Sequence, residues 1–247
     1  MLSVVIITLN EEAKVKDCLE SVAWADEIVV VDSFSKDNTV EIAREYTDKI
    51  YQRKFAGFGE QKNFALSKAS GDWILSIDAD ERVTSELQEE IARTLANPRA
   101  CGYYVRRKSY FSGKWIKHCG WWPDYILRLF RKDCGHFSDR LVHEAVKVNG
   151  PTAKLKNPLE HRPFSSTNDL FKKADEYSTL GARVMLAEGK RCSCYNALTH
   201  SVLAFIKTYF IRRGILDGWR GLAISFSNAA GVFYRYMKCL EMKEQQH

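Results

Sequence analysis

The first 98 residues alternate short apolar segments with longer amphipathic ones, and this order limits the possible folds more than any other feature. Strands are predicted at 3–9, 27–31, 50–51 and 73–77, and helices follow them at about 12–21, 39–46, 59–68 and 85–96. Repeated strand–helix units build a parallel sheet with right-handed crossovers. We therefore expect an α/β fold with a mostly parallel, Rossmann-like sheet flanked by helices.

The strand predicted at 73–77 is followed directly by the carboxylates Asp78, Asp80 and Glu81. Open α/β sheets bind their ligands at the carboxyl ends of the strands. Asp78 and Asp80 stand two residues apart, so both could reach one Mg²⁺ or Mn²⁺ ion, which prefers carboxylate oxygens. The alternative is a solvated turn that leads into the next helix.

Polar residues also follow the other strands, with Asn10 and Glu11 after the first and Asp32 after the second. Together with the later carboxylates they describe a nucleotide site at one edge of the sheet, where Asp32 could accept the imide N–H of a uracil ring. No G-x-G-x-x-G segment and no P-loop is present, so a dinucleotide fold would lack its phosphate loop. Lys62 could face a phosphate or the base, or else lie on a solvated helix face.

Charge is unevenly distributed along a chain whose formal net charge is +6. Residues 1–98 carry a net −8, residues 99–164 a net +9 and residues 165–247 a net +5. A basic second half indicates an anionic partner such as nucleic acid, anionic lipid or a phosphorylated acceptor. Nucleic acid is disfavoured, because the basic residues are scattered and no RRM, KH or zinc pattern is present.

The seven cysteines include no CxxC pair, which argues against a disulfide framework or a zinc ribbon. We therefore expect reduced thiols, as in a cytosolic protein. Residues 1–8 have no basic n-region, so no signal peptide is predicted.

The second half predicts two strands within 101–117, joined by a turn at 112–113. Arg106, Arg107 and Lys108 on the first of them could line an acceptor groove or simply form a solvated sheet edge. From residue 165 onward the period is helical, but no apolar run reaches the roughly 20 residues of a spanning helix. Basic residues interleaved with aromatic ones favour an interfacial helix on an anionic leaflet, and a helical bundle packed on the rest is the alternative.

Four motifs in the first 81 residues carry a family resemblance. They are Ser-Val-Val-Ile-Ile-Thr-Leu-Asn-Glu-Glu at 3–12, Ile-Val-Val-Val-Asp-Ser at 28–33 with Asp-Asn-Thr at 37–39, Gln-Lys-Asn at 61–63, and Asp-Ala-Asp-Glu at 78–81. In this order they resemble the family 2 glycosyltransferases of GT-A fold. Trp-Pro-Asp at 122–124, Arg-Leu-Phe-Arg at 128–131 and Leu-Val-His-Glu at 141–144 are similar to the branch with the lipopolysaccharide core β-1,4-glucosyltransferases.

The resemblance implies a role for each strand-end residue. Asp32 would bind the nucleotide base, with Asn10 and Glu11 beside it. Asp78 and Asp80 would hold the Mg²⁺ or Mn²⁺ ion that bridges the diphosphate of a UDP-sugar. His161 in Leu-Glu-His-Arg fits the histidine that often completes this metal site, although it could also be a plain surface histidine.

An inverting transfer needs one general base to take the proton from the acceptor hydroxyl. The family usually supplies it from an acidic pair after a Gly-Phe turn, and here Gly-His-Phe-Ser-Asp at 135–139 followed by His143 and Glu144 occupies that stretch. The sequence has His-Glu in place of Glu-Asp, so Glu144 is the first choice and Asp124 the second. Trp121 and Trp122, just before Asp124, suit stacking on a sugar or packing in the core.

Together these features predict an inverting hexosyltransferase that moves a sugar, expected to be glucose, from a UDP-sugar to a lipopolysaccharide inner-core heptose or similar lipid-linked acceptor. Residues 1–164 would form the GT-A catalytic domain, with a nucleotide-sugar half at 1–98 and an acceptor half at 99–164. Residues 165–247 would form a helical, membrane-associating appendage, peripheral on the cytoplasmic face of the inner membrane. The alternatives are a non-catalytic nucleotide-sugar-binding protein and a glycosyltransferase acting on another cell-envelope glycan.

Overall fold

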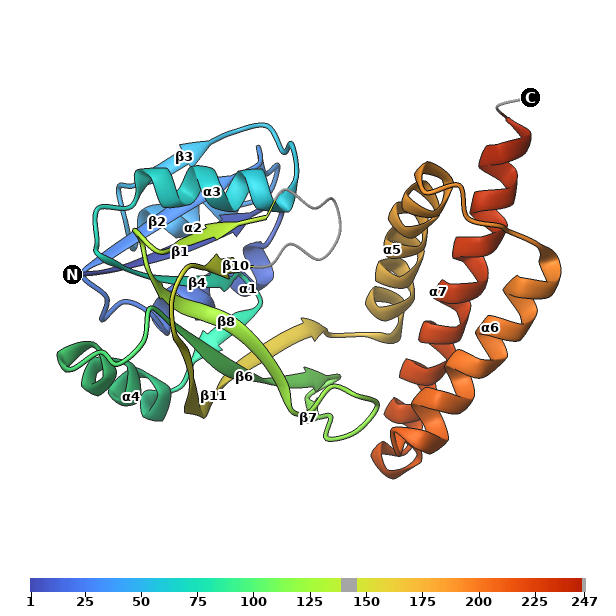
Figure 1. The fold of residues 1–247 in the computed structure, drawn as a ribbon. Helices are drawn as coiled ribbons and strands as arrows, with labels where there is room; N and C mark the ends of the chain where they lie inside the picture. The colour runs from blue at the N-terminus through green and yellow to red at the C-terminus, as the bar shows by residue number, and fades with distance from the viewer. Residues whose placement is uncertain (139–145, 246–247) are drawn as a thin grey trace. The chain divides into compact units, whose positions relative to one another are not determined.

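The computed structural model describes residues 1–138 and 146–245 and divides into two compact units. The first unit contains Met1–Lys108 and Asp124–His161, and the second contains Ser109–Pro123 and Arg162–His247. The first is a mixed α/β unit and the second is mainly helical (Figure 1). The α/β class predicted from the sequence is confirmed, whereas a domain boundary at residue 164 stays a prediction.

Four parallel strands form one half of the sheet, in the order β3-β2-β1-β4. They are β1 (Leu2–Thr8), β2 (Glu27–Asp32), β3 (Ile50–Gln52) and β4 (Trp73–Asp78). Strand β1 lies between β2 and β4, with Thr8 opposite Asp32 and Ile7 opposite Asp78. The ends of β2 and β4 therefore reach the same edge of the sheet on either side of β1.

Both faces of β1, β2 and β4 are buried, which explains their nearly continuous apolar sequence. Val4 and Ile6 of β1 belong to a core cluster that includes residues of α1 (Glu12–Glu20), α2 (Thr39–Arg44) and α4 (Ser85–Ala96). Val5 belongs to a second cluster with Ala65 and Leu66 of α3 (Phe58–Lys68). The alternation along β1 thus places α3 on the opposite face of the sheet from α1 and α2.

The sheet continues beyond β4 in the order β4-β8-β6-β11-β5, in which β8 pairs with β4 and with β6, and β11 with β5, in the antiparallel sense. They are β5 (Glu81–Val83), β6 (Gly102–Phe111), β8 (Asp124–Arg131) and β11 (Thr152–Phe164), and β7 (Lys114–Trp115) pairs with β6. A separate pair joins β9 (Gly135–Phe137) to β10 (Val146–Val148). The pairing of β5 with β11 places His161 opposite Glu81, although 80 residues of chain separate them.

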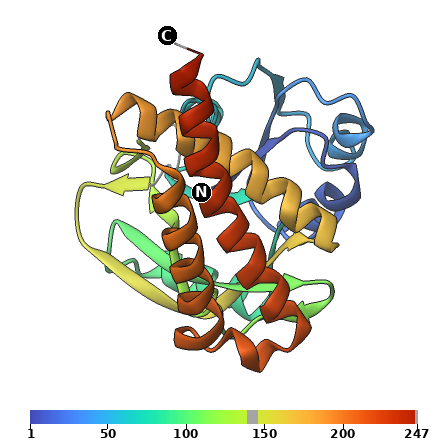
Figure 2. The same ribbon diagram turned by 90° about the vertical axis from the view of Figure 1, so that its right-hand side faces the viewer.

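Three long helices form most of the second unit: α5 (Thr167–Ala187), α6 (Cys194–Ile206) and α7 (Trp219–Glu244). Helix α7 is in contact with both α5 and α6, as Figure 2 shows. Two short helical turns, η1 (Lys207–Ile211) and η2 (Gly214–Asp217), connect α6 to α7. Within the described residues, no helix is both long and apolar enough to span a membrane.

The structure corrects the expectation of reduced thiols at one place. Cys192 and Cys239 form a disulfide whose Cα atoms lie 6.5 Å apart, joining the segment before α6 to α7. The two cysteines are 47 residues apart in sequence, so their pairing depends on helix packing that no sequence spacing reveals. Five other cysteines are free thiols.

Candidate active site

The carboxylate at the end of β4 is held by two buried cations. The Lys62 ammonium on α3 lies 2.9 Å from Asp78 Oδ1, and the Arg128 guanidinium on β8 donates a hydrogen bond to Asp78 Oδ2. Burial alone would raise the pKa of Asp78, but Arg128 and Lys62 outweigh burial and hold that pKa well below its ordinary value. Asp78 is therefore an ionised carboxylate with a fixed position.

The same guanidinium connects Asp78 to the next acid of the motif. Arg128 donates a hydrogen bond of 2.6 Å to Glu81 Oε1, and Glu81 Oε2 accepts one of 3.0 Å from the backbone N–H of Asp78. Arg107 extends the network, because its guanidinium lies 3.9 Å from Glu81 Oε1 and pairs with Asp124 at 2.5 Å. A chain of alternating charges thus links the end of β4 to Asp124 at the start of β8.

Asp80 stands apart from this network, next to a histidine. His161 Nε2 lies 3.6 Å from Asp80 Oδ2, and the pKa of Asp80 is lowered because this pairing outweighs burial. The other oxygen, Oδ1, is buried and finds no hydrogen-bond partner in residues 1–138 and 146–245. A buried acceptor with no partner is costly, so Asp80 is suited to bind a cation or another donor that a ligand supplies.

The donor atoms present fit a divalent cation that substrate phosphates help to hold. No cluster of three or more His, Cys, Asp or Glu side chains able to hold a metal occurs in the described part of the chain. Mg²⁺ is commonly bound through one or two carboxylates together with substrate phosphates, so a complete protein cage is not required. Asp80 and His161 provide adjacent donors for such an ion, while both oxygens of Asp78 already contact cations.

Asp32 is completely buried at the end of β2, where its carboxylate fixes the following loop. Its oxygens accept hydrogen bonds from Thr8 Oγ1 at 3.0 Å and from the Ser35 backbone and hydroxyl at 2.8 and 2.5 Å. On strand β1, Asp32 lies opposite Thr8, and Asp78 lies opposite Ile7. Because successive residues of a strand point to opposite faces, the side chains of Asp32 and Asp78 leave the same sheet edge on opposite faces. Sequence reasoning placed both acids at one edge, but it did not foresee this difference of face.

Asn10 and Glu11 lie beside the Asp32 loop, as the sequence predicted for neighbours of a base-binding acid. The Asn10 backbone N–H donates to Ser35 Oγ at 2.8 Å, and Asn10 Oδ1 accepts from the Lys36 backbone at 2.8 Å. The Glu11 backbone N–H donates a hydrogen bond to Thr39 Oγ1 at 2.8 Å. These contacts order the segment after β1, and a role in binding a nucleotide stays a prediction.

Two sequence-based alternatives are settled by these positions. Lys62 is only 4% exposed, so the alternative of a solvated helix face is wrong. Arg107 is paired with Asp124 across the β6–β8 ladder and is not a free edge residue. Glu144, the first choice for the general base, lies outside the described residues, whereas Asp124 is described and is bound to Arg107.

Sequence reasoning missed Arg128 and Glu81 as parts of the site. Both are buried, with Arg128 6% and Glu81 0% exposed. The signal for Arg128 was present, because a single arginine within the apolar run 126–130 must be buried on a central strand and therefore needs a partner.

Comparison with known proteins agrees with this geometry. The model of glycosyl transferase family 2 matches residues 3–149. The chain therefore belongs to family 2 of the glycosyltransferases, and it is an inverting glycosyltransferase of GT-A fold.

Two relatives match over nearly the whole chain. The lipopolysaccharide core biosynthesis glycosyltransferase LpsC of Rhizobium meliloti is 32% identical over 95% of this chain and 93% of its own length. An uncharacterized glycosyltransferase of Rickettsia typhi is also 32% identical, over 98% of this chain and 87% of its own length. The crystal structure of residues 1–349 of Staphylococcus aureus TarS in complex with UDP matches 100% of this chain and 92% of that chain, with a TM-score of 0.50 and 16% identity, which is a likeness of fold alone.

We predict that Arg128→Gln destabilises the protein far more than Arg131→Gln on the same strand. Removing Arg128 takes away the 2.6 Å ion pair of the buried Glu81 and leaves it only the 3.9 Å contact with Arg107, and breaking a buried ion pair typically costs about 3–5 kcal/mol. Arg131 forms its ion pair with Asp133 at the surface, where such pairs contribute about 0–1 kcal/mol. Urea unfolding of both variants measures the difference, and equal stabilities would contradict a structural role for the network.

Proposed function

We propose that this glycosyltransferase moves a hexose, expected to be glucose, from a UDP-sugar to a lipopolysaccharide inner-core heptose or a similar lipid-linked acceptor. The observation that carries the donor site is the buried Asp80 oxygen, which has no hydrogen-bond partner among the described residues and lies next to the Asp78 carboxylate paired with Lys62. The role of LpsC in lipopolysaccharide core biosynthesis supports the acceptor class, and the UDP complex of TarS supports the nucleotide.

In this proposal the residues after β4 receive the diphosphate. Asp80 and His161, with Asp78, would hold Mg²⁺ or Mn²⁺, which as a Lewis acid offsets the charge on the departing UDP. Lys62 and Arg128 keep Asp78 ionised and fixed, so the site is preorganised before the donor arrives. Asp32, with Asn10 and Glu11 beside it, would bind the uracil ring, with rotation of Ser35 freeing an oxygen of Asp32.

The transfer itself is an in-line displacement at the anomeric carbon. The acceptor hydroxyl oxygen forms the new bond as the bond to the UDP oxygen breaks, and a carboxylate takes the hydroxyl proton. We assign this base to Glu144 first. Asp124 is the second choice, because its carboxylate is already engaged in an ion pair with Arg107.

Two alternatives from the sequence remain to be distinguished from this proposal. Family membership favours an enzyme over a non-catalytic nucleotide-sugar-binding protein. A glycosyltransferase for another cell-envelope glycan would have the same donor site but a different acceptor. Mass spectrometry of lipopolysaccharide from a strain that lacks the protein separates these cases, since a missing inner-core hexose supports the proposal and an unchanged core contradicts it.

The helical unit has an exposed apolar surface that favours attachment to a membrane. Large apolar residues of α6, η1, η2 and the start of α7 are at least 38% exposed: Tyr195, Leu198, Val202, Leu203, Ile206, Phe210, Ile211, Ile215, Leu216, Trp219, Leu222 and Phe226. Lys207, Arg212 and Arg213 lie in the same segment. Apolar side chains with nearby basic groups suit the interface of an anionic leaflet, so we place the protein peripherally on the cytoplasmic face of the inner membrane.

We predict that Asp80→Ala lowers sugar transfer by at least about 100-fold, because it removes a carboxylate that we propose holds the metal ion. The measurement is UDP release as a function of Mn²⁺ concentration, with circular dichroism to verify folding. Asp133→Ala, which changes an exposed carboxylate of the same unit, serves as the control and should keep full turnover. Full turnover of Asp80→Ala, or of the wild type in chelator, would rule out the metal role.

We predict that Glu144→Gln loses transfer by about 10²–10⁴-fold while still binding UDP, as expected when a general base is removed without changing the donor site. Asp124→Asn is prepared in parallel, and both are measured by single-turnover kinetics and by calorimetry with UDP. A normal rate for Glu144→Gln together with a large loss for Asp124→Asn would move the base to Asp124.

We predict that replacing Phe210, Ile211 and Leu216 together by serine lowers binding to vesicles that contain phosphatidylglycerol. These side chains are 56%, 72% and 63% exposed, so their removal should leave the fold intact. Phe171→Ser, at a residue 38% exposed on α5, is the control for a general loss of apolar surface. Cosedimentation measures the effect, and unchanged binding of the triple variant would contradict the membrane surface.

A further inference from the structure

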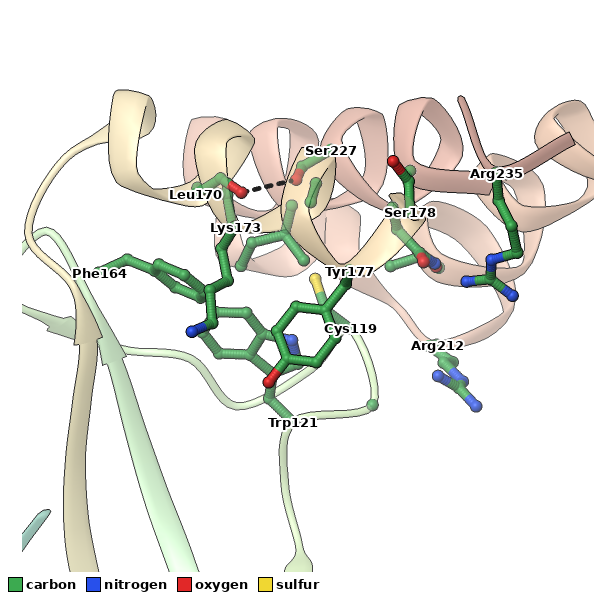
Figure 3. A pocket seen from close by; sticks show the side chains of 16 residues that line it. Cys119, Trp121, Phe164, Leu170, Lys173, Tyr177, Ser178, Arg212, Ser227 and Arg235 are labelled. Carbon is green, nitrogen blue, oxygen red and sulfur yellow. Dashed lines mark hydrogen bonds between the residues drawn. The ribbon is translucent and has the colours of Figure 1, made fainter. Parts of the chain in front are cut away.

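The helical unit contains a cavity of about 320 Å³ that is partly open to solvent and has no part in the donor site described above (Figure 3). Its walls come from α5, η1, α7 and the segment around Trp121, all of which belong to the second unit. The volume lies at the lower end of the range for small-molecule sites. It therefore suits a ligand of about the size of one sugar unit with a substituent.

The lining of this cavity is strongly basic. It contains Lys173, Arg212 and Arg235, and no Asp or Glu is among the described residues that line it. None of these three cations has a carboxylate within ion-pair distance in the described parts of the chain, and Arg235 Nε is a buried donor with no partner there. A buried guanidinium donor without an acceptor is costly in the free protein, so an anion that enters would satisfy it.

Two glycines allow the arginines to lie along the cavity wall. A Cβ on Gly120 would come within 2.6 Å of Arg212 Nη1, and one on Gly181 would come within 2.7 Å of Arg235 Nε. Gly120 also has a φ of +81°, which most residues avoid. The positions of both guanidinium groups thus depend on residues that have no side chain.

The cavity also has an aromatic end. Figure 3 shows the rings of Trp121 and Tyr177 at one end and the guanidinium groups of Arg212 and Arg235 at the other. Trp121 packs against Phe164 with 6.0 Å between ring centroids, which supports the core-packing alternative considered for this tryptophan while leaving it exposed to the cavity. Aromatic faces suit the apolar C–H surface of a sugar ring, while two arginine side chains suit the oxygens of a phosphate.

We propose that this cavity binds a phosphorylated sugar, with its phosphate between Arg212 and Arg235 and its ring against Trp121 and Tyr177. The inference rests on the proposed function only in identifying this sugar as part of the acceptor. A phosphomonoester has two negative charges near neutral pH and several acceptor oxygens, which matches unpaired cations better than a neutral sugar would.

The test is calorimetry on the full chain with mannose 6-phosphate, mannose and inorganic phosphate, in the absence of UDP-sugar and divalent metal. Because the donor site takes no part in this measurement, failure of the proposed transfer would not affect its result. Mannose 6-phosphate should bind at least tenfold more tightly than either mannose or phosphate. Equal binding of inorganic phosphate would overturn recognition of the sugar.

Arg212→Gln and Arg235→Gln should each weaken mannose 6-phosphate binding about tenfold or more, since each removes a charge-assisted contact. Arg183→Gln, at an exposed arginine of α5 outside the cavity, is the matched control and should bind as the wild type does. Tyr177→Phe keeps the ring and removes only the hydroxyl, so it should retain most of the affinity. Unchanged binding in both cavity variants overturns the proposal.

A second experiment tests whether the cavity binds a sugar phosphate or the phosphate of a lipid headgroup. Vesicles that contain phosphatidic acid are sedimented with the wild type and with Arg235→Gln. If Arg235→Gln lowers vesicle binding and leaves mannose 6-phosphate binding unchanged, the occupant is a lipid headgroup and the proposal is wrong. If Arg235→Gln binds vesicles as the wild type does but binds mannose 6-phosphate more weakly, the result supports the proposal.

Discussion

The buried charge network at the end of β4 is the interaction on which the proposed donor site depends. Glu81 has no solvent exposure, and a buried charge is tolerated only with a close partner. Arg128 is that partner, and the same guanidinium holds Asp78. The buried Glu81 thus requires Arg128, and Arg128 in turn fixes the position of Asp78. Asp80 lies outside these pairs and keeps an oxygen for a ligand.

The cations of the donor site and those of the cavity are used in different ways. In the first unit, Lys62, Arg107 and Arg128 are each paired with a carboxylate and hold it in place. In the second, Arg212 and Arg235 have no such partner among the described residues and line a cavity. A paired cation organises the protein, whereas an unpaired one is available to an anion from outside. The excess of basic residues in the second half of the sequence therefore has a structural counterpart.

The first four strands and helices were predictable because the main parallel strands, β1, β2 and β4, are buried on both faces and read as apolar runs between polar turns. The second half of the sheet, from β8 to β5, was harder to foresee. Strand β5 is three residues long and begins with two charged residues, and β11 mixes polar residues with Pro158 and Pro163. Neither segment shows a clear alternation, since partner strands distant in sequence decide which of its side chains are buried.

The sequence by itself determined the α/β class, the family and the acids at the strand ends, because these follow from local apolar runs and from short motifs. The tertiary structure decided which of those acids are already paired. Arg128 reaches Asp78 from 50 residues away, and His161 reaches Asp80 only because β11 pairs with β5. It also created the cavity and the Cys192–Cys239 link, since both require helices to pack side by side. Contacts between distant segments depend on register and packing, which no local pattern of residues encodes.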